Sequence, residues 1–200
     1  NLIDRGALKK GECVLIQGGT SGIGYTAIQI AKFVGAKVLA TGRTIEKCDA
    51  IRRFGADRAI NYVEEDFEII ATDFTGGNGV DVILDIVGGP YIPKELNILA
   101  KNGRLVFVNL SAGKVVEADF GQIHAKHLTV TGSRLRPRSI AEKAAICRSL
   151  KQQIWPAFDT GDIKVEVFER YSFEQATAAH MLMESSAHIG KILLYPGFEN

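Results

Sequence analysis

Apolar runs and amphipathic helical patterns alternate along the first two thirds of the chain. Runs of about four to eight residues, the length of buried strands, are each followed by apolar residues at helical spacing. The predicted strands are residues 13–17, 37–41, 58–61, 80–87, 103–109 and 128–132, and the predicted helices are 22–34, 44–53, 64–74, 91–99 and 120–126. The α/β alternation predicts a Rossmann-type, doubly wound sheet of six parallel strands.

The pattern changes after Ser133. A long helical pattern covers residues 140–154, and a short strand (165–168), a helix (173–184) and a last strand (191–195) follow. We therefore expect a boundary near Ser133 and Arg134. At the other end, Leu2 and Ile3 follow Asn1 with no capping residue, so we expect residues 1–9 to finish a linking helix that begins elsewhere.

A cluster of glycines, Gly18-Gly19-Thr20-Ser21-Gly22-Ile23-Gly24, separates the first predicted strand from the first predicted helix. Glycines here allow a tight bend and let the backbone approach a pyrophosphate, which amide N–H groups at the helix start then bind. The spacing differs from G-x-G-x-x-G, so the turn alone is equally compatible with a plain strand-to-helix connection. The helix and parallel-strand patterns that follow favour a dinucleotide site.

The residues after the second predicted strand bear on which dinucleotide binds. Sites that prefer NAD carry Asp or Glu there, to bind the ribose hydroxyls. Here the sequence is Thr41-Gly42-Arg43-Thr44, with Lys47 close behind. A carboxylate would repel a 2′-phosphate, whereas Arg43 and Lys47 would attract one. Both cations are also compatible with ordinary solvated surface charges, but the missing acid favours NADPH over NADH.

Charge and composition argue against several other classes of protein. The formal net charge of +1 gives no field for gathering nucleic acid, and the apolar runs are too short to span a membrane. Three widely spaced cysteines fit free thiols in a reducing compartment, so we expect a cytoplasmic protein. No cysteine pair has zinc-ligand spacing, and His124 and His127, spaced as two metal ligands could be, have no third ligand nearby, so we expect no metal. We interpret Asp85 as a turn cap, and we interpret as helix-surface or packing residues His124, His127, His180 and His188.

Short motifs follow one another in a fixed order through nearly all of the chain. Besides the glycine turn they are Gly11-Glu12-x-Val14-Leu15-Ile16, Ala27-Ile28-Gln29-x-Ala31-Lys32, Gly35-Ala36-x-Val38, Glu46-Lys47-Cys48, Phe54-Gly55-Ala56, Ile60-Asn61-Tyr62, Gly79-Val80-Asp81-Val82-Ile83-Leu84-Asp85, Gly132-Ser133-x-Leu135-Arg136-x-Arg138 and His188-Ile189-Gly190-Lys191-Ile192. In this order they resemble the medium-chain dehydrogenase/reductase superfamily, specifically its zinc-free quinone oxidoreductase (zeta-crystallin-like) branch.

The resemblance implies NADPH as the cofactor and assigns roles to individual residues. The positions that match the 2′-phosphate site are Lys47 and Tyr62. Those that match the pyrophosphate-binding turn are Ser21, Gly22 and Ile23, and those that match segments beneath the nicotinamide ribose are Val87, Asn109, Leu110, Ser133 and Leu135. Arg43 departs from the small residue common at its place, so its role, next to Gly42 in the expected site, is inferred from charge alone.

The resemblance also implies a domain organisation. Residues 10–133 would be the NADPH-binding Rossmann domain, and residues 134–200 the return of the chain into a GroES-like catalytic domain that is mostly absent here. That segment should expose apolar surface or be partly disordered. In the family the sixth strand is a sheet edge that pairs with a second subunit, so we expect a homodimer.

The expected function is that of an NADPH-dependent quinone or enone oxidoreductase, with this chain as a cofactor-binding part that is inactive alone. No residue is a convincing acid, base or nucleophile, so the catalytic residues stay unassigned. One alternative is an enoyl or alkenal reductase of the same superfamily, and another is an NADPH-binding protein without turnover. A short-chain dehydrogenase is disfavoured, because no tyrosine is followed four residues later by the lysine that such chemistry needs.

Overall fold

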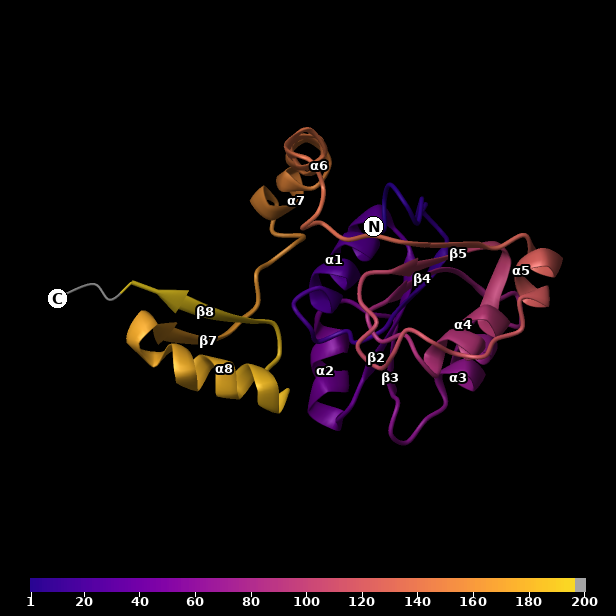
Figure 1. Cartoon of the computed structure of the whole chain (residues 1–200), viewed down its shortest axis with the longest axis horizontal. Coiled ribbons are helices and arrows are strands. Elements are labelled where there is room, and N and C mark those ends of the chain that lie inside the picture. Colours follow the sequence, from indigo (N-terminus) through magenta and orange to yellow (C-terminus); the bar gives the residue numbers. More distant parts are fainter. Residues whose placement is uncertain (197–200) are drawn as a thin grey trace.

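The computed structural model describes residues 1–196 and contains the predicted sheet of parallel strands (Figure 1). The strands are β1 (Cys13–Ile16), β2 (Lys37–Gly42), β3 (Arg58–Asn61), β4 (Val80–Asp85), β5 (Leu99–Phe107) and β6 (Thr129–Gly132). Their order is β3-β2-β1-β4-β5-β6, and each neighbouring pair is parallel. The order reverses between β1 and β4, and the carboxyl ends of the strands at such a switch point form the usual ligand crevice of open α/β sheets.

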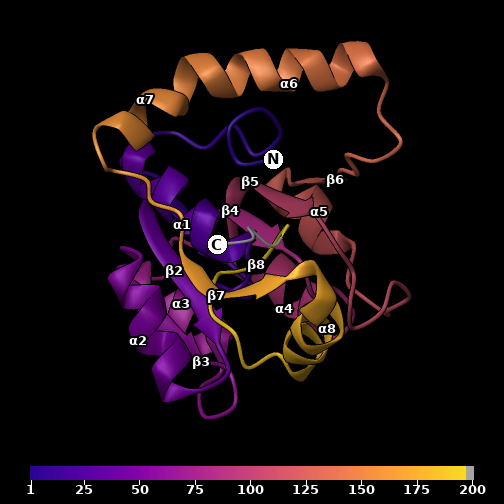
Figure 2. The same ribbon diagram turned by 90° about the vertical axis from the view of Figure 1, so that its left-hand side faces the viewer.

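Helices cover both faces of the sheet (Figures 1 and 2). They are α1 (Gly24–Val34), α2 (Ile45–Arg53), α3 (Phe67–Phe74), α4 (Tyr91–Ile98) and α5 (Gly121–Lys126). Alternate residues of β1 point to opposite faces: Val14 and Ile16 pack with α1 and α2, whereas Leu15 packs with α3 and α4. The two apolar clusters explain why the strands are apolar on both faces.

Several element boundaries differ from the sequence prediction because side chains capture backbone N–H groups. Helix α3 begins at Phe67, not at residue 64, because Asp66 caps it and the Glu65 carboxylate accepts from the Asn61 N–H at 2.9 Å. Strand β4 ends at Asp85, two residues early, because that carboxylate accepts from the Val87 N–H at 2.6 Å. The turn-capping role predicted for Asp85 is thereby confirmed. Strand β5, in contrast, begins at residue 99, four residues earlier than predicted.

Residues 1–9 form turns instead of the predicted helix end. The Gly6 N–H donates to the Asn1 carbonyl at 2.7 Å, and the Leu8 N–H donates to the Leu2 carbonyl at 3.0 Å. Leu2 and Leu8 are buried in the apolar cluster beneath α1. The Arg104 guanidinium on β5 donates to the Gly6 carbonyl at 2.7 Å, so this segment packs against the sheet.

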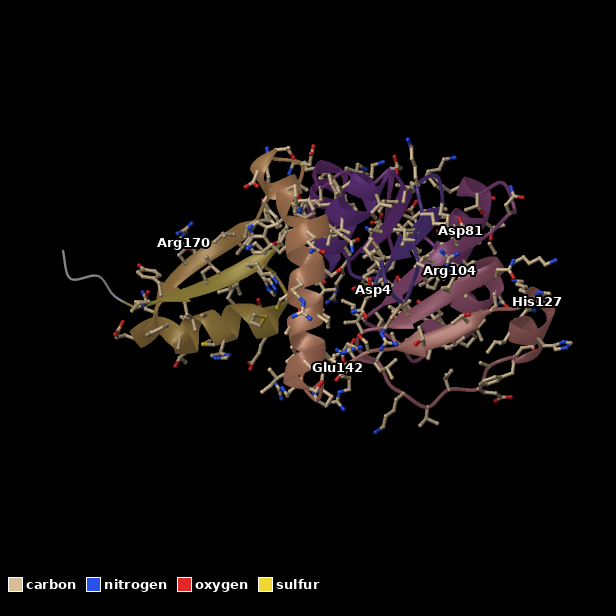
Figure 3. All side chains as sticks on the ribbon, turned by 90° about the horizontal axis from the view of Figure 1, so that it is seen from above. Asp4, Asp81, Arg104, His127, Glu142 and Arg170 are labelled. Carbon is tan, nitrogen blue, oxygen red and sulfur yellow. The ribbon has the colours of Figure 1, made fainter. Side chains whose placement is uncertain are left out.

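The rest of the described chain forms a smaller unit beside the sheet domain. Its elements are α6 (Ile140–Gln153), α7 (Trp155–Asp159), β7 (Val167–Ser172), the 3-10 turn η1 (Phe173–Gln175), α8 (Ala176–Ser185) and β8 (Lys191–Tyr195). Strands β7 and β8 pair in parallel, and Figure 3, seen from above, shows α6 lying over the boundary between this pair and the sheet domain. The sequence missed α7 and placed β7 two residues too early. Large apolar side chains are exposed here, among them Ile140, Trp155 and Met181.

Hydrogen bonds of α1 and of the glycine turn help to attach this unit to the sheet domain. The Gln29 side chain on α1 accepts from the Lys164 N–H at 2.7 Å and donates to the Lys164 carbonyl at 3.1 Å. The Gly190 N–H donates to the Thr20 carbonyl of the glycine turn at 2.9 Å. Among residues 1–196 no helix is both long and apolar enough to cross a membrane.

We predict that backbone amides of residues 134–196 exchange hydrogen with solvent faster than those of β1 and β4, because few side chains of this segment are buried. Hydrogen–deuterium exchange followed by mass spectrometry measures both regions in one experiment. Equal protection of the amides in residues 134–196 and in β1 and β4 would show that no domain boundary lies near Ser133. Residues 197–200, the end of the predicted segment, lie outside the described residues.

Candidate functional site

The glycine turn is held by its own hydrogen bonds and by close packing on β2. Gly18 adopts φ 70° and donates its N–H to the Thr41 hydroxyl at 2.9 Å. The Ser21 hydroxyl donates to the Gly18 carbonyl at 2.8 Å and accepts from the Gly24 N–H at 2.9 Å. A Cβ on Gly24 would overlap the Gly18 carbonyl and lie 2.8 Å from the Cα of Gly19. The start of α1 can lie this close to β1 only because position 24 is glycine.

A cavity of about 300 Å³ opens in front of this turn, at the carboxyl ends of β1 and β2. Five predicted site residues line it: Ser21, Gly42, Arg43, Lys47 and Tyr62. The other lining residues are Gly18, Thr20, Thr41, Ile86, Ser111, Ser186 and His188. The set holds two full cations, several hydroxyls and no carboxylate.

The two cations of the cavity are unfavourable neighbours in the absence of an anion. Burial, and then the charge of Arg43, lower the pKa of Lys47. The Lys47 ammonium donates to the carbonyl of Ser186, a neutral partner that leaves its charge uncompensated. A bound anion would relieve this repulsion, because an opposite charge stabilises the protonated form of a lysine. The donor set therefore fits a phosphate group.

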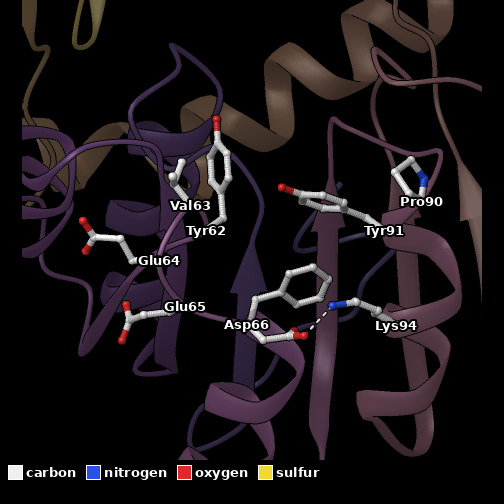
Figure 4. A pocket seen from close by; sticks show the side chains of 9 residues that line it. Tyr62, Val63, Glu64, Glu65, Asp66, Pro90, Tyr91 and Lys94 are labelled. Atoms are coloured by element: carbon white, nitrogen blue, oxygen red, sulfur yellow. Dashed lines mark hydrogen bonds and ion pairs between the residues drawn. The ribbon is translucent and has the colours of Figure 1, made fainter.

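A neighbouring cavity of about 380 Å³ shares Tyr62 but has the opposite chemistry (Figure 4). Three consecutive acids line it, Glu64, Glu65 and Asp66. Its one lysine, Lys94, is already paired with Asp66. An anion would meet net negative charge there, so the cavity at the end of β2 is the better phosphate site.

The remaining predicted residues lie outside this cavity. Asn109, Leu110 and Ser133 line a cavity of about 550 Å³ at the ends of β5 and β6. Val87 lies between the two, in the turn after β4, where its carbonyl accepts from the Ala112 N–H at 2.8 Å. The structure thus distributes these residues along the carboxyl edge of the sheet.

A further cavity, which is mainly apolar and has a volume of about 650 Å³, is lined by the predicted residues Gly22, Ile23 and Leu135. It lies between the start of α1, the N-terminal turns and α6. The predicted set is therefore spread over three cavities and the β4 turn.

Sequence reasoning missed the part of the site that comes from the C-terminal unit. Ser186 and His188 reach the cavity from the loop between α8 and β8, and Ser186 lies 139 positions from its partner Lys47. We predicted His188 to be a helix-surface or packing residue. It lies in a loop, not on a helix, and its Nδ1 is buried without a hydrogen-bond partner among residues 1–196. His188 begins one of the motifs above, but neither that motif nor the sequence around Ser186 indicates a place beside β2, because only tertiary packing brings both residues there.

Comparisons with known proteins identify relatives of nearly the whole chain. Residues 22–148 match the family model described as zinc-binding dehydrogenase. The 2-haloacrylate reductase of a Burkholderia species is 30% identical over an alignment of 196 residues that covers 94% of this chain and 57% of that protein. Quinone oxidoreductase 1 of Escherichia coli K12 is 32% identical over an alignment of 192 residues that covers 94% of this chain and 58% of that protein.

A solved structure matches the fold as well. The Escherichia coli quinone oxidoreductase complexed with NADPH superposes with a TM-score of 0.85 at 31% identity, covering 98% of this chain and 60% of that one. The chain thus spans somewhat more than half the length of these relatives. No group of three or more His, Cys, Asp or Glu side chains within residues 1–196 is placed to hold a metal ion.

We predict that Gly24→Ala lowers the free energy of unfolding by about 1–3 kcal/mol, because the added methyl overlaps backbone atoms that cannot move independently. Gly22→Ala is the matched control, since its methyl would meet only the flexible end of the Lys191 side chain. Urea unfolding of both variants measures the difference. Equal stabilities would show that the turn does not depend on this close approach.

Proposed function

Because the chain belongs to the zinc-binding dehydrogenase family, in the zinc-free quinone oxidoreductase-like branch of the medium-chain dehydrogenases/reductases, we propose that it is the cofactor-binding part of an NADPH-dependent quinone or enone oxidoreductase. The observation that carries the proposal is the cavity at the end of β2, with two cations and no carboxylate.

The chain's residues would divide the cofactor between them. The N–H groups of the glycine turn and the positive end of α1 would bind the pyrophosphate, as helix N-termini bind anions. Arg43 and Lys47 would hold the 2′-phosphate, and the Tyr62 hydroxyl would add a hydrogen bond. An acid at the end of β2 would exclude that phosphate, and none lines the cavity. The residues around Asn109 and Ser133 would receive the nicotinamide end, farther along the same edge.

When bound, NADPH supplies a hydride, and an electron-poor conjugated carbonyl is the substrate class that we propose to accept it. The chain's task is to bind and orient the cofactor. No acid, base or nucleophile lines the cavity at the end of β2 in a position that we can assign to proton transfer. We therefore propose that this chain alone binds NADPH without turnover.

A second candidate is a reductase of conjugated acids or thioesters, favoured by the 30% identity to the 2-haloacrylate reductase. An NADPH-binding protein without any turnover is a third. Oxidation of NADPH by a longer chain, assayed with quinones, enones and enoyl thioesters, separates the three. We also propose a cytoplasmic location, consistent with the free thiols Cys13, Cys48 and Cys147.

We predict that Lys47→Ala weakens NADPH binding by about 1.5–3 kcal/mol, the range for a lost hydrogen bond to a charged group, with little effect on NADH. Isothermal titration with both cofactors measures the difference. Lys37→Ala, at the opposite end of β2, is the control and should bind both cofactors unchanged. Equal losses for NADPH and NADH in Lys47→Ala would reject its 2′-phosphate role.

We further predict a homodimer that pairs the edges of two β6 strands, because β6 is one of the two edge strands of the sheet and an unpaired edge invites strand pairing. Val130 on this strand is 41% exposed, so Val130→Lys should shift the dimer towards monomer in sedimentation velocity. Val115→Lys, at a loop residue that is 90% exposed, is the control. A monomeric unmodified chain at high concentration would contradict the prediction.

A further inference from the structure

A line of buried polar side chains crosses the centre of the sheet beneath the glycine turn. It begins where the Gly18 N–H donates to the Thr41 hydroxyl at 2.9 Å. The Thr41 hydroxyl donates to Oε1 of Gln17 at 2.9 Å, and Nε2 of Gln17 donates to Oε1 of Glu95 on α4 at 3.0 Å. Each donor in this line points the same way, from the turn towards Glu95.

Two carboxyl groups meet at the far end of the line. Asp85 and Glu95 are both 0% exposed. Asp85 accepts from the Val87 N–H at 2.6 Å and from the Gly88 N–H at 2.9 Å, and the Glu95 carboxyl is its neighbour. The second Glu95 oxygen, Oε2, is buried and accepts from no donor among residues 1–196.

The direction of the hydrogen bonds determines where a proton must lie. Oε1 of Glu95 already accepts from Gln17, and Asp85 already accepts from two backbone N–H groups. A hydrogen bond between the two carboxyl groups requires a donor. The two N–H groups on Asp85 favour its ionised form, so the proton belongs on Oε2 of Glu95, the oxygen without a partner. Two ionised carboxylates buried in contact would repel each other strongly, as in other carboxylate pairs that share a site.

We propose that Glu95 is held as a neutral carboxylic acid that donates its proton to an ionised Asp85, and that this pair positions the two nucleotide-binding turns relative to each other. One turn is fixed through Gly18, and the other through the N–H groups of Val87 and Gly88. Glu95 touches neither turn directly, so it is a positioning residue. The positioning of the nucleotide-binding turns rests on the proposed function, whereas the protonation of Glu95 does not.

The surroundings of the pair agree with this assignment. Burial, and then the charge of Asp85, raise the pKa of Glu95 well above its usual range. Burial also raises the pKa of Asp85, but the N–H groups of Val87 and Gly88 oppose that shift, so the proton resides on Glu95. The groups that face the pair are Gln17, the first residue after β1, and Tyr91 from α4, and neither is a cation.

The proton makes stability depend on pH in a defined direction. In the unfolded chain Glu95 loses its proton near the usual pKa of a glutamate, while in the folded chain it keeps the proton to higher pH. The folded state then binds more protons than the unfolded state, so this group's contribution to stability falls as pH rises between the two pKa values. Glu95→Gln, whose amide can accept from Gln17 and donate to Asp85 without titrating, removes this contribution.

Infrared spectroscopy of the chain in D₂O, without cofactor, tests the proton directly. We expect a carbonyl-stretching band of a protonated carboxylic acid at neutral pH, lost in Glu95→Gln and retained in Glu64→Gln, which removes an exposed carboxylate. Urea unfolding between about pH 5 and pH 9 should show a smaller loss of stability with rising pH in Glu95→Gln than in the unmodified chain. Absence of the band at neutral pH would overturn the proposal.

Titration with NADPH tests the positioning role. We expect Glu95→Ala to bind NADPH at least about tenfold more weakly, and Glu95→Gln to recover an affinity within about twofold of the unmodified chain. A loss of NADPH affinity in Glu95→Gln as large as in Glu95→Ala would overturn this role. If Glu95→Ala fails to fold, Glu95→Gln is compared with the unmodified chain alone, and a loss of about tenfold in Glu95→Gln would overturn the role. If the unmodified chain does not bind NADPH, the proposed function fails, while the infrared result still decides the protonation of Glu95.

Discussion

The start of α1 lies so close to the end of β1 that residue 24 has no room for a side chain. A methyl group there would overlap the Gly18 carbonyl and approach the Cα of Gly19 to 2.8 Å. This contact holds the start of α1 against the glycine turn, beside the point where the strand order reverses. The proposed binding of the pyrophosphate depends on it, because the positive end of a helix acts only over its first turn. We propose that the cations at the end of β2 add selectivity to this backbone arrangement.

The sequence predicted the sheet well because each signal is local. Apolar runs identified the six strands, and the helix predicted over residues 44–53 forms at 45–53, capped by Thr44. Predictions were poorest where a side chain competes with the regular hydrogen-bond pattern. Asp85 ends β4, and Glu65 delays α3, through hydrogen bonds to N–H groups two and four residues away. The predicted helix end in residues 1–9 was wrong. Leu2 and Ile3 follow Asn1 without a capping residue, but the segment forms turns, and these turns bury Leu2 and Leu8.

The candidate site shows a similar division. Four predicted residues lie shortly after the ends of β1, β2 and β3, where a local pattern can be recognised, and the fold brings them to one cavity: Ser21, Arg43, Lys47 and Tyr62. Ser186 and His188 come from a loop more than a hundred positions away, so no pattern in either segment indicates the other. Glu95 presented a related difficulty, because an acid in an amphipathic helix is ordinarily solvated. Only the packing of α4 on the sheet reveals that it faces Asp85 and Gln17.

We propose above all that the cavity at the end of β2 selects a phosphorylated adenosine. A crystal structure of the chain with NADPH would decide this. We expect the pyrophosphate against the glycine turn and the 2′-phosphate between Arg43 and Lys47, with the Lys47 ammonium released from the Ser186 carbonyl. A 2′-phosphate that lies in solvent, away from both cations, or a glycine turn without a diphosphate would contradict it.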